Sequence, residues 1–238
     1  MNDPYKWLTD FFSNRKIRSP DTLEFKMPAV FERYFLIFDN YGILEDYPFD
    51  KLPEGASEQE QENRYKLERS FELKLRNSFR PLSFYKPVSL RELATLLHTD
   101  YGVDMFDHLK LSGGFMALWN LTVENLTRFI EIVRQEEPLC FYIADYGRYP
   151  KGFPHKRDED AREKNEITDL SEYFKFQERS GMDACTYLFR KARPWCLATF
   201  EDLRVFILGC DQQTAEKLSM VEGLEYFEIP ADYDLHLK

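Results

Sequence analysis

The stretch WCLATFEDLRVFILGCDQQTAEKL, residues 195–218, decides the fold. It contains two short apolar runs, WCLATF and LRVFILG, which are separated by Glu201 and Asp202 and so predict two strands joined by a tight hairpin. From Asp211 to Gly223 the pattern becomes helical, with Asp211 at the N-cap position and Gly223 as the C-terminal stop. Cys210 therefore stands where a strand passes into a helix, a place where several classes of enzyme hold a nucleophile.

The surroundings of Cys210 argue against a catalytic thiolate. A helix N-terminus lowers the pKa of a nearby thiol, but the carboxylate of Asp211 beside the sulfur opposes ionisation. A C-x5-R phosphate loop would need an arginine at position 216, where this sequence has a glutamate. We therefore expect Cys210 to be a buried, unreactive thiol.

The residues around this stretch extend the strand and helix pattern over 138–238. LCFYIADY (139–146) has the length and composition of a strand, and LEYFEIP (224–230) is a last strand closed by Pro230. We expect TDLSEYFKF (168–176) and MDACTYLFRKA (182–192) to be helical. The resulting order, β-α-β-β-α-β, is compatible with the split βαβ arrangement of ferredoxin-like modules. The sheet of this region would be mixed or antiparallel.

The first 137 residues predict a mostly helical region. Phe31, Tyr34, Phe35 and Phe38 lie on one face if residues 28–42 are helical. The other signals are two S-x-x-E capping boxes, at Ser57–Glu60 and Ser89–Glu92, and a helical stripe over 121–133 that ends before Pro138. The fold class is thus α+β, with a mainly helical region (residues 1–137) packed on an α/β region (residues 138–238). The sequence leaves open whether these form one continuous domain.

Composition narrows the classes of function. Of the 238 residues 43% are hydrophobic and 16% aromatic, which indicates a packed globular protein. The formal net charge is −10, spread over both regions, and this disfavours nucleic-acid binding. We find no export signal and no apolar run long enough to cross a bilayer, so we expect a cytoplasmic protein with reduced cysteines and no membrane partner.

One long predicted loop combines side chains that could bind an anion with a histidine that could transfer a proton. DYGRYPKGFPHKRDEDAREK (145–164) follows a predicted strand, as binding loops often do. Arg148 and Lys151 could hold an anion, Tyr146 or Tyr149 could stack on a ring, and His155 could act as a general base. The alternative is a solvated surface loop whose prolines and glycines only supply turns.

The C-terminal residues ADYDLHLK offer a second pattern. If they are extended, Asp232, Asp234 and His236 point to one side, and carboxylates with an imidazole are reasonable ligands for a divalent metal. An edge strand with its polar face in water produces the same alternation. A chain terminus is also a poor support for rigid coordination, so we predict no bound metal and no cofactor.

These observations favour a non-enzymatic function without deciding the question. The usual dinucleotide and P-loop motifs are missing from the sequence, and 21 Phe and 14 Tyr exceed what a core of this size needs. We expect a protein-binding module, such as an inhibitor, an immunity-type protein or an adaptor, whose acidic charge favours a basic protein partner. The alternative is an enzyme or small-anion-binding protein with a site near the 145–157 loop.

Overall fold

The computed structural model describes residues 3–14, 22–52, 59, 62–63, 65–67, 69–71, 82–103, 105, 114–133, 138–146, 163–180, 184–200 and 205–235. These residues form an α+β protein with two compact units. Unit 1 comprises residues 1–38, 125–222 and 226–237, and unit 2 comprises residues 39–124, 223–225 and 238. The chain thus leaves unit 1 after its first strand and returns to it within a helix.

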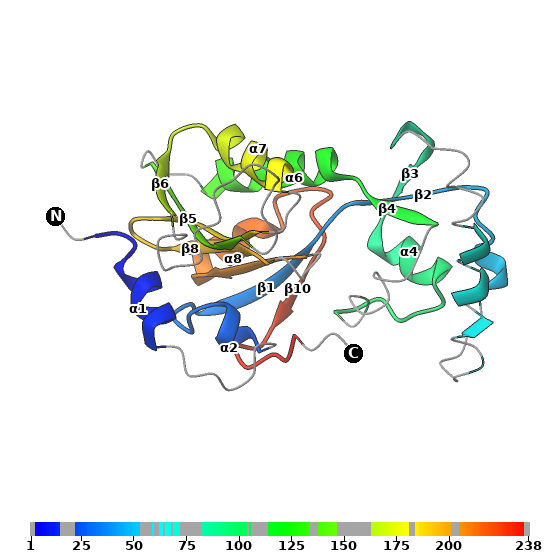
Figure 1. Ribbon diagram of the computed structural model, residues 1–238, viewed down its shortest axis with the longest axis horizontal. Coiled ribbons are helices and arrows are strands. Elements are labelled where there is room, and N and C mark those ends of the chain that lie inside the picture. The colour runs from blue at the N-terminus through cyan, green and yellow to red at the C-terminus, as the bar shows by residue number, and fades with distance from the viewer. Residues whose placement is uncertain are drawn as a thin grey trace. The chain divides into compact units, whose positions relative to one another are not determined.

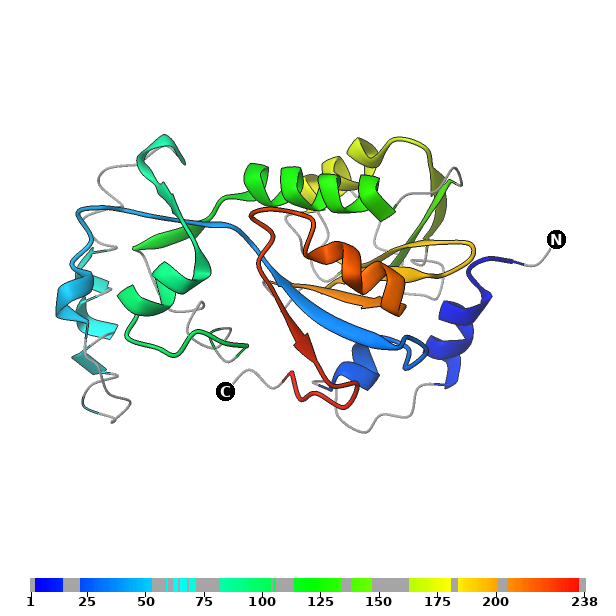
Figure 2. The ribbon, with the colours of Figure 1, turned by 180° about the vertical axis from the view of Figure 1, so that it is seen from behind.

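Unit 1 is built on a seven-stranded sheet in which all neighbouring strands are antiparallel, in the order β10-β1-β9-β8-β7-β5-β6. The strands are β1 (Arg33–Phe38), β5 (Leu139–Tyr146), β6 (Glu163–Ile167), β7 (Ala184–Arg190), β8 (Trp195–Thr199), β9 (Val205–Cys210) and β10 (Tyr226–Ile229). Figure 2 shows β10 in red along β1 in blue.

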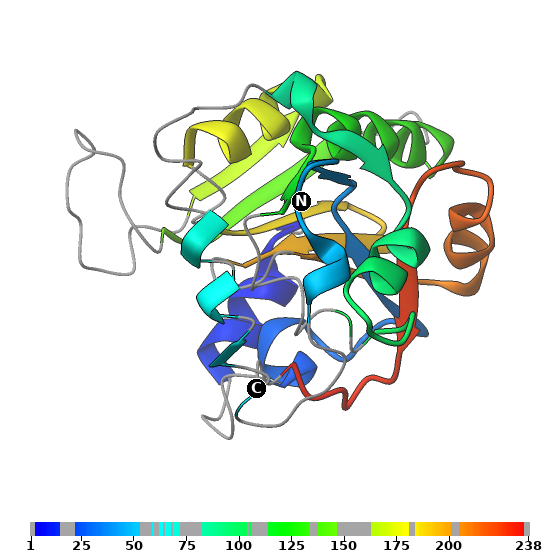
Figure 3. The ribbon, with the colours of Figure 1, turned by 90° about the vertical axis from the view of Figure 1, so that its right-hand side faces the viewer.

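Helices cover both faces of this sheet (Figure 1, Figure 3). One face carries α7 (Leu170–Ser180) and the portion of α6 (Trp119–Val133) that belongs to unit 1. The other face carries α1 (Lys6–Asn14) and α2 (Leu23–Lys26), while α8 (Gln212–Leu218) connects β9 to β10. Because both faces are covered, the central strands are buried throughout, and β9 has no exposed residue between Val205 and Cys210.

Unit 2 contains a three-stranded antiparallel sheet in the order β3-β2-β4. Its described elements are β2 (Tyr41–Ile43), η1 (Phe49–Lys51), η2 (Leu82–Phe84), β3 (Lys86–Val88), α4 (Leu90–Leu96) and β4 (Phe115–Ala117). Residues 223–225 join this unit through Glu225, whose Oε1 accepts a hydrogen bond of 3.1 Å from the first helical N–H of α4, that of Leu90.

Several local predictions are confirmed. Residues 195–199 and 205–210 are adjacent antiparallel strands, and Asp211 caps α8 by accepting a hydrogen bond of 2.7 Å from the Thr214 N–H. The Ser89–Glu92 capping box opens α4. Gly223 has a positive φ of 80°, but α8 already ends at Leu218, so this glycine lies in the connection to β10. The Ser57–Glu60 capping box lies outside the described residues.

Two predicted helices are strands. Residues 33–38 form β1, and residues 184–190 form β7. In β1 the five residues from Tyr34 to Phe38 are all buried. A strand covered on both faces has a continuous apolar run, and such a run also satisfies a helical spacing by chance.

These two strands change the topology. The central β1 comes from the N-terminal region, which also contains β2, β3 and β4, and the helices are not confined to that region, because α7 and α8 lie in the C-terminal region. The ferredoxin-like order is therefore not confirmed. The antiparallel pairing and the α+β class are confirmed.

Candidate functional site

The predicted binding loop leaves the sheet between β5 and the edge strand β6. Tyr146 is the last residue of β5 and pairs with Ala184, and the register of β5 against β7 shifts between Ile143 and Asp145, as in a β-bulge. Bulges are frequent beside active sites. The side chain of Tyr146 is not described, and Arg148, Tyr149, Lys151 and His155 lie outside the described residues. Their proposed roles therefore stay predictions.

A buried polar cluster lies under α7 next to this end of the sheet. Gln177 Nε2 donates to Thr186 Oγ1 at 2.6 Å and to Thr199 Oγ1 at 3.1 Å, and the two threonine hydroxyls are 2.6 Å apart. Tyr173 adds its hydroxyl at 3.3 Å from Thr186 Oγ1. Thr186 faces Ile143 at the bulge in the sheet register.

The chemistry of this cluster is neutral. Burial raises the pKa of Tyr173 to about 12, so its hydroxyl stays protonated near neutral pH. Amide and hydroxyl groups that hydrogen-bond to one another fix the position of a helix on a sheet but carry no charge that would hold an anion. We therefore assign the cluster a structural role.

The C-terminal metal candidates do not form a recognisable site. Asp232 and Asp234 are exposed, and Asp234 forms an isolated antiparallel bridge with Thr22. His236 lies outside the described residues. Within the described ranges, no cluster of three or more His, Cys, Asp or Glu residues could hold a metal ion.

Cys210 is fully buried, as expected from the sequence. Burial first, and then the neighbouring Asp211 carboxylate, raises the pKa of its thiol to about 12. All four cysteines are free thiols, and only Cys185 is partly exposed. A thiol with these properties is a poor nucleophile at neutral pH.

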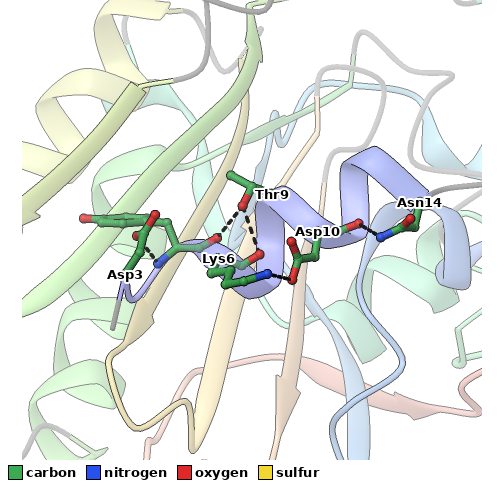
Figure 4. Close-up of polar contacts among 6 residues, drawn as sticks. Asp3, Lys6, Thr9, Asp10 and Asn14 are labelled. Carbon is green, nitrogen blue, oxygen red and sulfur yellow. Dashed lines mark hydrogen bonds and ion pairs between the residues drawn. The ribbon is translucent and has the colours of Figure 1, made fainter. Parts of the chain in front are cut away.

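The helix α1 carries a surface that the sequence patterns did not point to. Asp3 precedes the helix and accepts a hydrogen bond of 2.9 Å from the Tyr5 N–H, and Lys6 and Asp10 form an ion pair of 2.5 Å one turn apart. Asn14 Nδ2 donates to the Asp10 carbonyl at 2.8 Å near the end of the helix. Figure 4 shows Asp3, Lys6, Asp10 and Asn14 along α1.

The opposite side of α1 is aromatic and packs on the sheet. The ring of Tyr5 lies 5.7 Å from that of Phe189, and the ring of Phe12 lies 5.6 Å from that of Tyr187. Both contacts are edge-to-face, the arrangement that aromatic pairs prefer. The helix is therefore held by the sheet through rings with few rotatable bonds.

Between these two sides, a partly exposed aromatic surface joins α1 to two turns of the sheet. The Trp7 ring packs edge-to-face on Phe189 at 5.2 Å and on Phe31 at 6.0 Å. Arg193, in the turn between β7 and β8, places its guanidinium carbon 5.8 Å from the Trp7 ring centroid. Val30, next to Phe31, is 64% exposed. We call Trp7, Val30, Phe31 and Arg193 the aromatic patch.

Gly209 explains how Phe31 reaches this position. A Cβ atom at residue 209 would lie 2.4 Å from Phe31 Cδ2 and 2.8 Å from Met27 Sδ, closer than nonbonded atoms can approach. The glycine in β9 therefore leaves room for the Phe31 ring on the face of the sheet that α1 and α2 cover.

The aromatic patch has no linear signature in the sequence. The three aromatic and basic residues of the patch come from distant segments of the chain, namely Trp7, Phe31 and Arg193. The strand β1, which begins two residues after Phe31, was predicted to be helical. The only available signal was compositional, the excess of aromatic residues, and this signal names no position.

Comparisons with known proteins add no relationship. The sequence matches no protein-family model, no curated protein and no solved structure. Among the described helices, none has the length and apolar character needed to cross a membrane.

Proposed function

We propose that this protein is a protein-binding module and that the aromatic patch is its contact surface. The observation that carries the proposal is Trp7, a partly exposed tryptophan held between two rings and covered on one side by the guanidinium of Arg193. Tryptophan and arginine are enriched among the residues that dominate binding energy at protein interfaces.

The patch is ordered before any partner arrives. The Trp7 ring packs on Phe31 and Phe189. The helix α1, to which Trp7 belongs, is held on the sheet by the rings of Phe12 and of Tyr5, the residue just before the helix. Because these rings are already immobilised, binding would cost little additional side-chain entropy. Val30, which precedes Phe31 in the chain, adds an aliphatic group that is well exposed to solvent.

A matched pair of exposed residues tests the proposal. Val30 is 64% exposed and Met220, outside the patch, is 67% exposed, so each can be replaced by aspartate at small cost to the fold. The full chain, immobilised as wild type, Val30→Asp and Met220→Asp, is used to capture proteins from its own cells. A captured protein is then purified and its affinity for each variant is measured by calorimetry.

We expect Val30→Asp to weaken the affinity of the purified partner by about tenfold or more, because it places a charge in the contact surface. Met220→Asp should leave that affinity unchanged. The proposal is wrong if the two variants bind the partner equally well.

A second candidate function is a small-anion site, or an enzyme site, at the 145–157 loop. The bulge between Ile143 and Asp145 supports it, because bulges often redirect residues next to functional loops. The double variant Arg148→Gln/Lys151→Gln tests this candidate. If phosphate or citrate raises the Tm of the wild type and of this variant by the same amount, the loop does not hold the anion.

A further inference from the structure

We infer that the aromatic patch binds a partner segment in which a carboxylate group lies next to an apolar side chain. This inference rests on the proposed function and specifies the chemistry of the partner. It starts from Arg193, whose guanidinium forms no ion pair within the portion of the chain that the structure describes, although it is exposed and held over Trp7.

Several charged side chains that flank the patch have ion-pair or hydrogen-bond partners within the protein. Lys6, Lys191 and Arg33 pair with carboxylates, and Glu32, the residue after Phe31, accepts a backbone hydrogen bond from the first residue of α8. These pairs are Lys6–Asp10 at 2.5 Å, Lys191–Glu166 at 3.0 Å, Arg33 Nε–Glu228 Oε1 at 2.7 Å and Glu32 Oε2–Gln212 N at 2.9 Å. Arg193 is the one charged residue among the four that define the patch, so the charge that the patch itself offers is positive.

The backbone fixes the position from which the Arg193 side chain leaves the turn. Its φ is 58°, in the left-handed region, and its N–H closes the turn by donating to the Arg190 carbonyl at 2.9 Å. A guanidinium that stacks on a ring keeps its N–H groups at its edge, where they match the two oxygens of a carboxylate. The turn thus presents a carboxylate receptor on an aromatic support.

The apolar portion of the partner follows from Val30 and Phe31. Phe31 packs on the Trp7 ring, and Val30, the residue before it in the chain, is well exposed. We expect a partner that places a carboxylate on Arg193 to place an apolar side chain on the Trp7 and Phe31 rings and on the exposed Val30. Acidic residues interspersed with apolar ones supply this combination.

The net charge of −10 does not contradict an acidic contact. At physiological ionic strength the Debye length is about 8 Å, so distant exposed charges are largely screened. The net charge therefore acts mainly on the rate of encounter, whereas a contact at Arg193 depends on the charge in the patch. The basic partner that the net charge favours is the competing expectation.

The test uses three sets of immobilised twelve-residue peptides with leucine and tryptophan at the same positions. The remaining positions carry aspartate and glutamate in one set, lysine and arginine in the second, and serine and glutamine in the third. The full chain is applied as wild type, Arg193→Gln and Lys191→Gln. Lys191→Gln is the matched control. It removes a positive charge from the same turn, but this charge already forms an ion pair with Glu166.

We expect the wild type to bind the acidic set best, and Arg193→Gln to lose about tenfold or more of that binding. Lys191→Gln should keep it. The inference is overturned if the acidic set does not bind, if the basic or neutral set binds as well, or if the two variants behave alike. If the wild type binds the basic set and Val30→Asp abolishes that binding, this inference is overturned and the proposed function stands.

Discussion

Arg33 and Glu228 form a two-pronged ion pair that joins β1 to the edge strand β10. Arg33 Nε donates to Glu228 Oε1 at 2.7 Å, and Arg33 Nη2 donates to the other carboxylate oxygen. Arg33 Nη1 also donates to Gln212 Oε1 at 3.2 Å, at the start of α8. One guanidinium therefore connects an edge strand, a central strand and the first turn of a helix.

This pair predicts a small loss of stability in acid. Hydrogen bonding to Arg33 lowers the pKa of Glu228, so the carboxylate stabilises the fold above the ordinary glutamate pKa of about 4.3, and this stabilisation is lost as the pH falls below it. Because the pair is partly exposed, we expect a contribution of about 0.2–1 kcal/mol. Urea unfolding of wild type and Glu228→Gln should differ at pH 7 and converge near pH 3. An equal difference at both pH values would contradict the assignment.

Gly209→Ala should disturb the aromatic patch through the core. The added methyl group would lie 2.4 Å from Phe31 Cδ2, so the ring must move, and overpacking of this kind costs about 1–3 kcal/mol. Gly102→Ala is the control, because nothing lies within 4 Å of its Cβ position. Thermal unfolding of both variants checks the prediction. If Gly209→Ala is as stable as Gly102→Ala, Phe31 is not confined by β9.

Local signals in the sequence were reliable where a polar side chain marks the end of an element. Asp211 and Ser89 cap helices as predicted, because a side chain that satisfies free backbone N–H groups acts within its own turn. The sequence also predicted the two strands on either side of Glu201 and Asp202, β8 and β9. In these cases the information lies within a few residues of the structure that it determines.

The central strand β1 was not predictable from local spacing. Its neighbours are β9 and β10, and the paired residues are between 167 (Phe38 and Val205) and 195 (Tyr34 and Ile229) positions apart in sequence. Burial by these strands and by helices on both faces makes its apolar pattern continuous. The aromatic patch could not be found for the same reason. Trp7 and Arg193 meet only because α1 packs on the sheet beside the turn between β7 and β8.

The polar cluster under α7 should contribute more to the free energy of unfolding than an exposed hydroxyl group does. Thr186→Val removes the group that accepts from Gln177 at 2.6 Å and contacts Thr199 at 2.6 Å, and weakening a buried polar network costs about 1–3 kcal/mol. Thr95→Val, at an exposed helix position, should cost less than about 0.5 kcal/mol. Urea unfolding of both variants measures the difference. Similar costs would mean that the cluster does not position α7.

The left-handed backbone of Arg193 predicts an unusual order of stability. Glycine adopts a φ of 58° without strain, whereas alanine keeps the steric cost of about 1 kcal/mol. We therefore expect Arg193→Gly to be more stable than Arg193→Ala, although glycine is less stable than alanine at most regular positions. Thermal unfolding decides the order. A more stable alanine variant would show that the turn does not hold residue 193 in this conformation.

The four thiols should differ in their reactivity. Burial raises the pKa of Cys210 to about 12, which leaves a thiolate fraction of roughly 10⁻⁴ at pH 8, and Cys140 and Cys196 are fully buried as well. Cys185, which is partly exposed, should therefore react first with iodoacetamide.

Mass spectrometry of the labelled peptides checks this order in the native protein and in guanidinium chloride. Cys210 should be labelled only when the protein unfolds, because both its thiolate fraction and its access to the reagent are suppressed in the folded state. Cys185→Ser is the control, and it should leave the native protein almost unlabelled at pH 8. Rapid labelling of Cys210 in the folded Cys185→Ser variant would mean that the end of β9 opens to solvent, and it would restore the thiol as a candidate nucleophile.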